Sequence, residues 1–130
     1  MIEKIDHIGV AVEDLDAVVN FYEQALGLKV TEKMDHGVSR GAFIKIGEVD
    51  VEFLENKDPN SAIARHIEKR GEGIHHIALQ VKRIEERMEE LRKKGIPFVD
   101  EKPRPGARGS RISFMHPKST YGVLLELVER

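Results

Sequence analysis

Two histidine–glutamate pairs recur along this chain at nearly the same spacing. His7 and Glu52 lie 45 residues apart, and His76 and Glu126 lie 50 residues apart. Two imidazoles and two carboxylates that meet at one point are a ligand set suited to a divalent metal ion. The spacing therefore predicts one metal site, to which each half of the chain contributes one pair.

The residues around the two pairs repeat as well. Residues 7–12 and 76–81 read HIGVAV and HIALQV, and residues 49–55 and 123–129 read VDVEFLE and VLLELVE. A duplicated fold related by a pseudo-twofold axis would bring all four side chains together. A coincidence is an improbable explanation for four matching positions in the two halves, so we interpret the quartet as a metal site.

The composition of this quartet limits its chemistry. Two carboxylates make the set too rich in oxygen for a sealed structural zinc site, which favours cysteine. It suits a five- or six-coordinate cobalt, manganese, nickel, zinc or iron ion with two positions open to a bidentate oxygen ligand. An ion of this kind stabilises an enolate, and a nearby carboxylate acts as base, so the set indicates proton abstraction next to a carbonyl.

The elements that position the quartet follow one plan twice. Hydrophobic periodicity and turn residues predict strand, helix and then three strands in each half. The expected strands are residues 5–12, 28–33, 38–46, 49–55, 74–81, 96–100, 111–115 and 122–129, and helices fall at about 15–26, 61–70 and 84–94. We predict an α+β fold of residues 1–130, with βαβββ modules at about 1–56 and 72–130 and a short helical linker at 57–71.

Strand alternation predicts which face each ligand occupies. Successive side chains of a strand point to opposite faces, and all four candidate ligands lie opposite the apolar residues that face the helices. A mixed sheet curved around the ligand face would form a cleft with the metal at its centre. Each half leaves one alternative ligand. Glu55 would replace Glu52 after a register slip of one residue, and His75 is the alternative to His76, although the alignment of the repeats favours His76.

Composition excludes several other classes of protein. The chain has 130 residues, 21 basic and 23 acidic side chains and a net charge of −2, so no basic surface indicates a nucleic-acid partner. No apolar run is long enough to span a membrane, and the first residues do not form a signal peptide. Without cysteine, disulfides and thiolate chemistry are excluded, and a cytoplasmic location is the expectation.

The chain resembles the vicinal oxygen chelate superfamily, and within it the methylmalonyl-CoA epimerase family, over nearly its full length. The segments that carry the resemblance are DHIGVAV at 6–12, FY…LGL at 21–28, RGEGIHHIA at 70–78, PRPGA at 103–107, SFMHPKS at 113–119 and GVLLEL at 122–127. The FY…LGL pattern occurs throughout the superfamily. The HPKS turn and the GIHHI segment favour the epimerases, because glyoxalase I and dioxygenase relatives usually carry an Asp-Pro-x-Gly turn.

This resemblance implies a homodimer of paired βαβββ modules that acts on a CoA thioester. His7, Glu52, His76 and Glu126 would hold a divalent metal, for which we favour cobalt over zinc, manganese or nickel. The substrate's carboxylate and thioester oxygen would chelate the ion, which would stabilise the enolate between the (R) and (S) forms of methylmalonyl-CoA. Glu126 is the family's candidate for one of the two proton carriers.

Two positions depart from the family pattern. Arg40 stands where some members have the glutamate that serves as the second proton carrier, so Glu48, Glu52 or a metal-bound water would have to replace it. Tyr121 stands where the family commonly has glycine. Basic residues of the loop at 102–109 and nearby form either a CoA-phosphate contact or a solvated surface: Arg104, Arg108, Arg111 and Lys118.

Two other functions remain open on the sequence alone. Glyoxalase I uses the same ligand set on a glutathione hemithioacetal, and a metal-free protein of this fold could sequester a small molecule. A sequestering cleft does not need a complete His/Glu quartet, so the quartet favours an enzyme.

Overall fold

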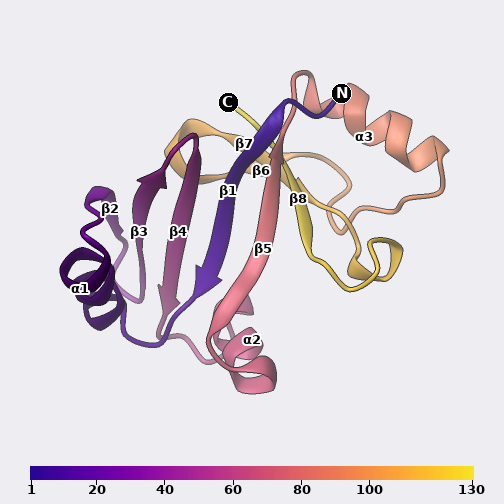
Figure 1. Cartoon of the computed structure of the whole chain (residues 1–130). Coiled ribbons are helices and arrows are strands. Elements are labelled where there is room, and N and C mark those ends of the chain that lie inside the picture. The colour runs from indigo at the N-terminus through magenta and orange to yellow at the C-terminus, as the bar shows by residue number, and fades with distance from the viewer. The chain divides into compact units, whose positions relative to one another are not determined.

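The computed structural model describes all 130 residues, which form two compact units. One unit comprises residues 7–75, and the other joins residues 1–6 to residues 76–130. Three helices accompany the strands, namely α1 (Leu15–Leu26), α2 (Ala62–Arg70) and α3 (Ile84–Lys93) (Figure 1). None of the helices is long and apolar enough to cross a membrane.

The unit of residues 7–75 contains four strands in the order β2-β3-β4-β1. These strands are β1 (Lys4–Ala11, which begins in the other unit), β2 (Val30–Asp35), β3 (Ser39–Ile46) and β4 (Val49–Asn56). β3 runs antiparallel to β2 and β4, while β1 runs parallel to β4. Gly47 at φ 63° provides the tight turn between β3 and β4, where a side chain would be strained.

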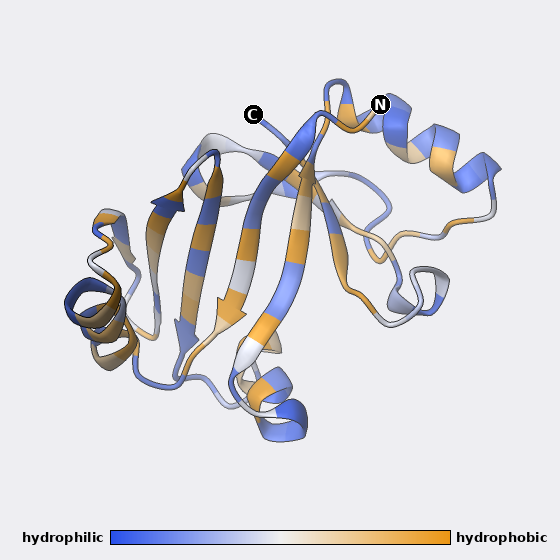
Figure 2. Ribbon diagram, in the orientation of Figure 1, coloured by the Kyte–Doolittle hydropathy of each residue, from blue (hydrophilic) through white to orange (hydrophobic).

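Helix α1 begins and ends as the sequence predicts. The side chain of Asp14 caps the first turn by accepting a hydrogen bond from the Ala17 amide, and Gly27 ends the helix in the left-handed conformation. The inner side of the helix packs on the sheet. This core contains Val12, Leu15, Val19, Ala42, Ile44 and Phe53. In Figure 2 the hydropathy alternates along β1 and β4, as expected for strands with two different faces.

The second unit repeats the parallel pairing. Its strands are β5 (Gly73–Gln80, which begins in the first unit), β6 (Arg104–Pro105), β7 (Arg111–Phe114) and β8 (Leu125–Glu129). β8 runs parallel to β5 and antiparallel to β7, and β7 pairs with β6. The Glu3 amide donates to the Gln80 carbonyl, so the start of β1 lies beside the end of β5. The core of this unit contains Val81, Ile84, Met88, Met115 and Leu127.

The predicted α+β class and mixed sheet are confirmed, but three predicted strands are wrong in extent. β2 runs from Val30 to Asp35 rather than over residues 28–33. Residues 96–100 form only a single bridge, between Phe98 and Met115, and a two-residue β6 pairs with β7 instead. Pro97 has no amide hydrogen to donate to a ladder, which limits the pairing there. The module limits at residues 56 and 72 stay a prediction.

The last strand begins at Leu125 rather than at residue 122. Tyr121 and Gly122 both have positive φ angles, 55° and 88°, and the Val123 amide donates back to the Thr120 carbonyl. This turn is incompatible with an extended strand, so β8 starts only after it.

In the first unit, an arginine and a glutamate tie the sheet to the N-terminus of α1. Arg40 on β3 donates to both carboxylate oxygens of Glu55 on β4, at 2.9 and 3.1 Å, and it also contacts Asp16. The same Glu55 carboxylate accepts a hydrogen bond from the Leu15 amide at the start of α1, at 2.8 Å. An anion at this end of a helix satisfies a free amide and complements the helix dipole.

The second unit contains the same arrangement at the corresponding positions. Arg111 on β7 donates to Glu129 on β8 at 3.0 Å and to Glu85 at 2.6 Å, and Glu129 accepts from the Ile84 amide at 3.0 Å. We call these two arrangements the helix clamps. The first consists of Arg40, Glu55, Asp16 and the Leu15 amide; the second consists of Arg111, Glu129, Glu85 and the Ile84 amide.

Replacement of Glu55 with alanine should destabilise the protein. The change leaves the buried Leu15 amide without its acceptor and Arg40 without its main partner, which should lower the free energy of unfolding by about 1–3 kcal/mol. Urea denaturation of Glu55→Ala and of a control, Glu23→Ala on the exposed side of α1, measures the difference. Equal losses in the two variants would contradict the clamp.

The clamps also predict a dependence of stability on pH. Hydrogen bonds from Arg40 lower the pKa of Glu55, and those from the Ile84 amide and Arg111 lower the pKa of Glu129. A carboxyl group whose folded pKa lies below its unfolded value of about 4.3 stabilises the fold above that pH, and this stabilisation is lost as the pH falls further.

At pH 7 the free energy of unfolding should therefore be higher for the wild type than for Glu129→Gln. This difference should shrink as the pH falls from about 4.3 to about 3. Denaturation curves at a series of pH values measure it. A difference that stays constant down to pH 3 would argue against a charged Glu129 in the fold.

Candidate functional site

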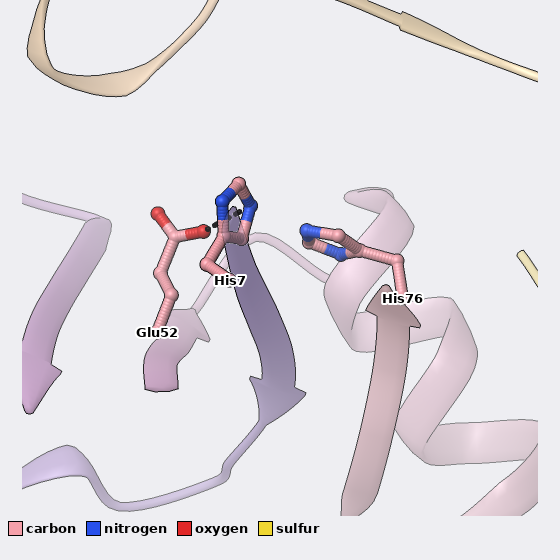
Figure 3. Close-up of side chains that lie close together, drawn as sticks. All are labelled: His7, Glu52 and His76. Atoms are coloured by element: carbon pink, nitrogen blue, oxygen red, sulfur yellow. Dashed lines mark ion pairs between the residues drawn. The ribbon is translucent and has the colours of Figure 1, made fainter. Parts of the chain in front are cut away.

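His7 and Glu52 form the first of two buried histidine–glutamate pairs. The His7 Nε2 and Glu52 Oε1 atoms lie 3.4 Å apart, and the dashed line in Figure 3 marks this contact. The two residues come from neighbouring parallel strands, β1 and β4, and only 5% and 6% of their surfaces are exposed. Gly9 of β1 stands in register with Glu52, so β1 places no side chain directly beside this carboxylate, while Phe43 of β3 stands in register on the other side.

His76 and Glu126 form the second pair, in the other unit. The His76 Nε2 and Glu126 Oε2 atoms lie 3.7 Å apart, and both residues are buried. They also come from neighbouring parallel strands, β5 and β8, and Figure 3 shows His76 on β5. The residue in register with Glu126 is again small, Ala78.

The two pairs therefore repeat in detail. In each, an Nε2 atom lies close to a carboxylate oxygen, across a parallel pair of strands and next to a residue with little or no side chain. A histidine nitrogen and a carboxylate oxygen are both ligands that divalent transition metals accept. The donor atoms of each pair thus fit the kind of ion that the sequence predicts.

The structure separates the predicted ligands from their rivals. Glu55 lies on the opposite face of β4 from Glu52 and belongs to the first helix clamp. His75 packs edge-on against His66 of α2, with ring centroids 5.0 Å apart. Burial, followed by the charge of His66, lowers the pKa of His75 to about 4, so this imidazole is neutral at pH 7.

Arg40 and Arg111 are both engaged in the helix clamps. Arg40 lies at the position where the family resemblance places a glutamate, but its guanidinium binds Glu55 and Asp16. Arg111, which the sequence suggested as a phosphate contact, binds Glu85 and Glu129. Both arginines therefore stabilise the fold, and neither is a proton acceptor.

Sequence reasoning missed an aromatic neighbour of the second pair. Phe114 on β7 stands in register with Glu126, so the two side chains share one face of the sheet. Its ring lies perpendicular to the His76 imidazole, with centroids 5.4 Å apart, and the Arg104 guanidinium lies 5.6 Å from the Phe114 centroid. Strand alternation in residues 111–115 was the available signal, because it places Phe114 opposite the buried Ser113.

Comparison with protein families gives one match over most of the chain. The model of the Glyoxalase/Bleomycin resistance protein/Dioxygenase superfamily matches residues 6–114. Human mitochondrial methylmalonyl-CoA epimerase is 36% identical over 128 residues, which cover 95% of this chain and 72% of the human protein.

Solved structures give the same result. A hypothetical protein from Bacillus halodurans superposes with a TM-score of 0.93 at 46% identity, covering 98% of this chain and 94% of that one. A variant of Streptomyces coelicolor methylmalonyl-CoA epimerase in complex with 2-nitronate-propionyl-CoA has a TM-score of 0.92 at 38% identity, and covers 99% and 95%.

Metal binding should distinguish Glu52 from Glu55. Glu52→Ala removes a carboxylate from the His7 pair and should weaken the binding of cobalt by at least about 10-fold. Glu55→Ala removes a carboxylate from the opposite face and should leave the affinity unchanged, although it destabilises the fold. Calorimetric titration of the folded variants measures both affinities. A loss of cobalt affinity in Glu55→Ala alone would make Glu55 the metal ligand and exclude Glu52.

Proposed function

Because this chain belongs to the Glyoxalase/Bleomycin resistance protein/Dioxygenase superfamily, we propose that it is a metal-dependent methylmalonyl-CoA epimerase. The observation that carries the proposal is the repeated, buried His–Glu pair on parallel strands. Relatives named as methylmalonyl-CoA epimerases, matched over nearly all of this chain, support the choice of reaction.

In this proposal His7, Glu52, His76 and Glu126 hold one divalent ion between them. When bound, the ion would act as a Lewis acid toward the substrate's carboxylate and thioester oxygens. Two nitrogen and two oxygen donors leave positions for that bidentate contact. Cobalt remains the predicted metal, with zinc, manganese or nickel as alternatives.

Glu126 is the proposed proton carrier on one face of the substrate. It is buried, its Oε2 atom lies 3.7 Å from His76, and a carboxylate oxygen can accept a proton. A Glu126 oxygen would accept the α-proton, the electron pair of the C–H bond would stay on the substrate as the enolate, and a second group would deliver a proton to the opposite face.

Inversion needs a second carrier on the opposite face. Arg40 cannot serve, since a guanidinium has no acceptor and this one is held by Glu55. Glu48 is exposed beside the Gly47 turn, whereas Glu52 is buried next to His7. We therefore assign the second proton to Glu52. A homodimer and a cytoplasmic location stay predictions of the sequence.

Exchange of the substrate's α-proton with solvent tests the proposal. In deuterated water the metal-loaded protein should incorporate deuterium into methylmalonyl-CoA, and a chelator should stop it. Glu126→Gln should slow incorporation by about 100- to 10,000-fold, because a neutral amide cannot accept the proton. Glu89→Gln, on the exposed side of α3, is the matched control.

Mass spectrometry of the recovered thioester gives the rate in each case. Chelator-insensitive exchange would remove the metal from the proposal, and normal exchange in Glu126→Gln would remove the role of Glu126. Turnover of a glutathione hemithioacetal without any exchange into methylmalonyl-CoA would favour glyoxalase I instead.

A further inference from the structure

Arg104 lies on the same face of the sheet as the second His–Glu pair. It occupies the two-residue strand β6 in register with Ile112 of β7, and Ile112 in turn stands in register with Val128 of β8. Side chains in register on neighbouring strands share a face. Val128 shares its face with Glu126, two residues earlier on β8, so Arg104 extends the ligand face toward the edge of this unit.

Two contacts hold the Arg104 side chain in place. Its Nε atom donates to Asp100 Oδ2 at 3.2 Å, and its guanidinium carbon lies 5.6 Å from the centroid of the Phe114 ring. A cation on an aromatic face is attracted by the negative charge of that face. The guanidinium is therefore oriented before any ligand arrives, although 53% of the side chain is exposed.

The terminal nitrogens of Arg104 make no hydrogen bond to the protein, in contrast to other arginines of this unit. Both terminal nitrogens of Arg111 donate hydrogen bonds to Glu85, and one terminal nitrogen of Arg130 donates to Asp6. Only the Nε atom of Arg104 is engaged, by Asp100. A guanidinium held by its Nε atom still presents Nη donors, which suit a carboxylate or phosphate.

Phe114 lies in contact with both Arg104 and His76. The Arg104 guanidinium lies over its ring, and the His76 imidazole is perpendicular to it, with ring centroids 5.4 Å apart. Arg104 is thus one aromatic ring away from a proposed metal ligand. The phosphates of CoA are separated from the thioester by the whole pantetheine arm, so an anion this close to His76 belongs to the acyl group.

We propose that Arg104 binds the free carboxylate of the acyl group and so selects malonyl-type thioesters over those of monocarboxylic acids. This inference rests on the proposed function. A carboxylate has two oxygens and about four acceptor positions, so contact with a metal leaves positions for an arginine. Arg104 is in this account a specificity-determining residue and transfers no proton.

Ligand binding to the cobalt-loaded protein tests this inference. Malonyl-CoA, propionyl-CoA and CoA are titrated into the wild type, Arg104→Gln, Arg104→Lys and a control, Lys102→Gln, which removes an exposed charge two residues away. Arg104→Gln should weaken the binding of malonyl-CoA by about 10- to 100-fold and that of propionyl-CoA by less than about 2-fold. Arg104→Lys should lie between, since it keeps the charge without the planar fork.

Lys102→Gln should bind all three ligands like the wild type, and every variant should bind cobalt with unchanged affinity. Equal losses for malonyl-CoA, propionyl-CoA and CoA in Arg104→Gln would overturn the inference and assign Arg104 to a CoA phosphate. Full retention of malonyl-CoA binding would also overturn it, while leaving the proposed function intact. Failure of the wild type to bind any CoA thioester would overturn both.

Discussion

The alternation of side chains along β4 and β8 determines which glutamates face the histidines and which face the helices. Each strand carries two glutamates three residues apart, Glu52 and Glu55 on β4 and Glu126 and Glu129 on β8. An odd separation sends the two carboxylates to opposite faces. One meets a histidine, and the other accepts a helix amide and an arginine. A slip of one residue would exchange the two faces, so the helix clamps also fix the register that presents the ligands.

This division explains how the fold tolerates three buried glutamates, Glu52, Glu55 and Glu126, and the partly buried Glu129. Each has a specific partner: the clamp glutamates bind an arginine and a backbone amide, and the ligand glutamates lie next to imidazoles. Buried charges are stable only when paired in this way. Arg40 takes part in this pairing as the partner of Glu55. In this chain the position belongs to the clamp face, and Arg111 repeats it in the other unit.

Much of the fold was predictable because its signals are local. The Asp14 cap, the Gly27 stop and the period-two pattern of residues 49–55 each specify an element without reference to distant residues. The extent of the strands was less predictable, since Phe98 alternates like a strand residue but finds only one partner. The four candidate ligands were identified from the repeat. The helix clamps and the contact of Arg104 with Phe114 were not, because they depend on which strands become neighbours.

In the proposed function, the two His–Glu pairs bind the same metal ion. The most direct measurement is a titration of the protein with cobalt, followed by the visible absorption of the bound ion, in the wild type, His7→Ala and His76→Ala. The wild type should bind one ion per chain, and both variants should lose most of their affinity, since each removes a ligand from the same ion. Two ions per chain, or a variant that loses one ion and keeps another with native affinity, would contradict it.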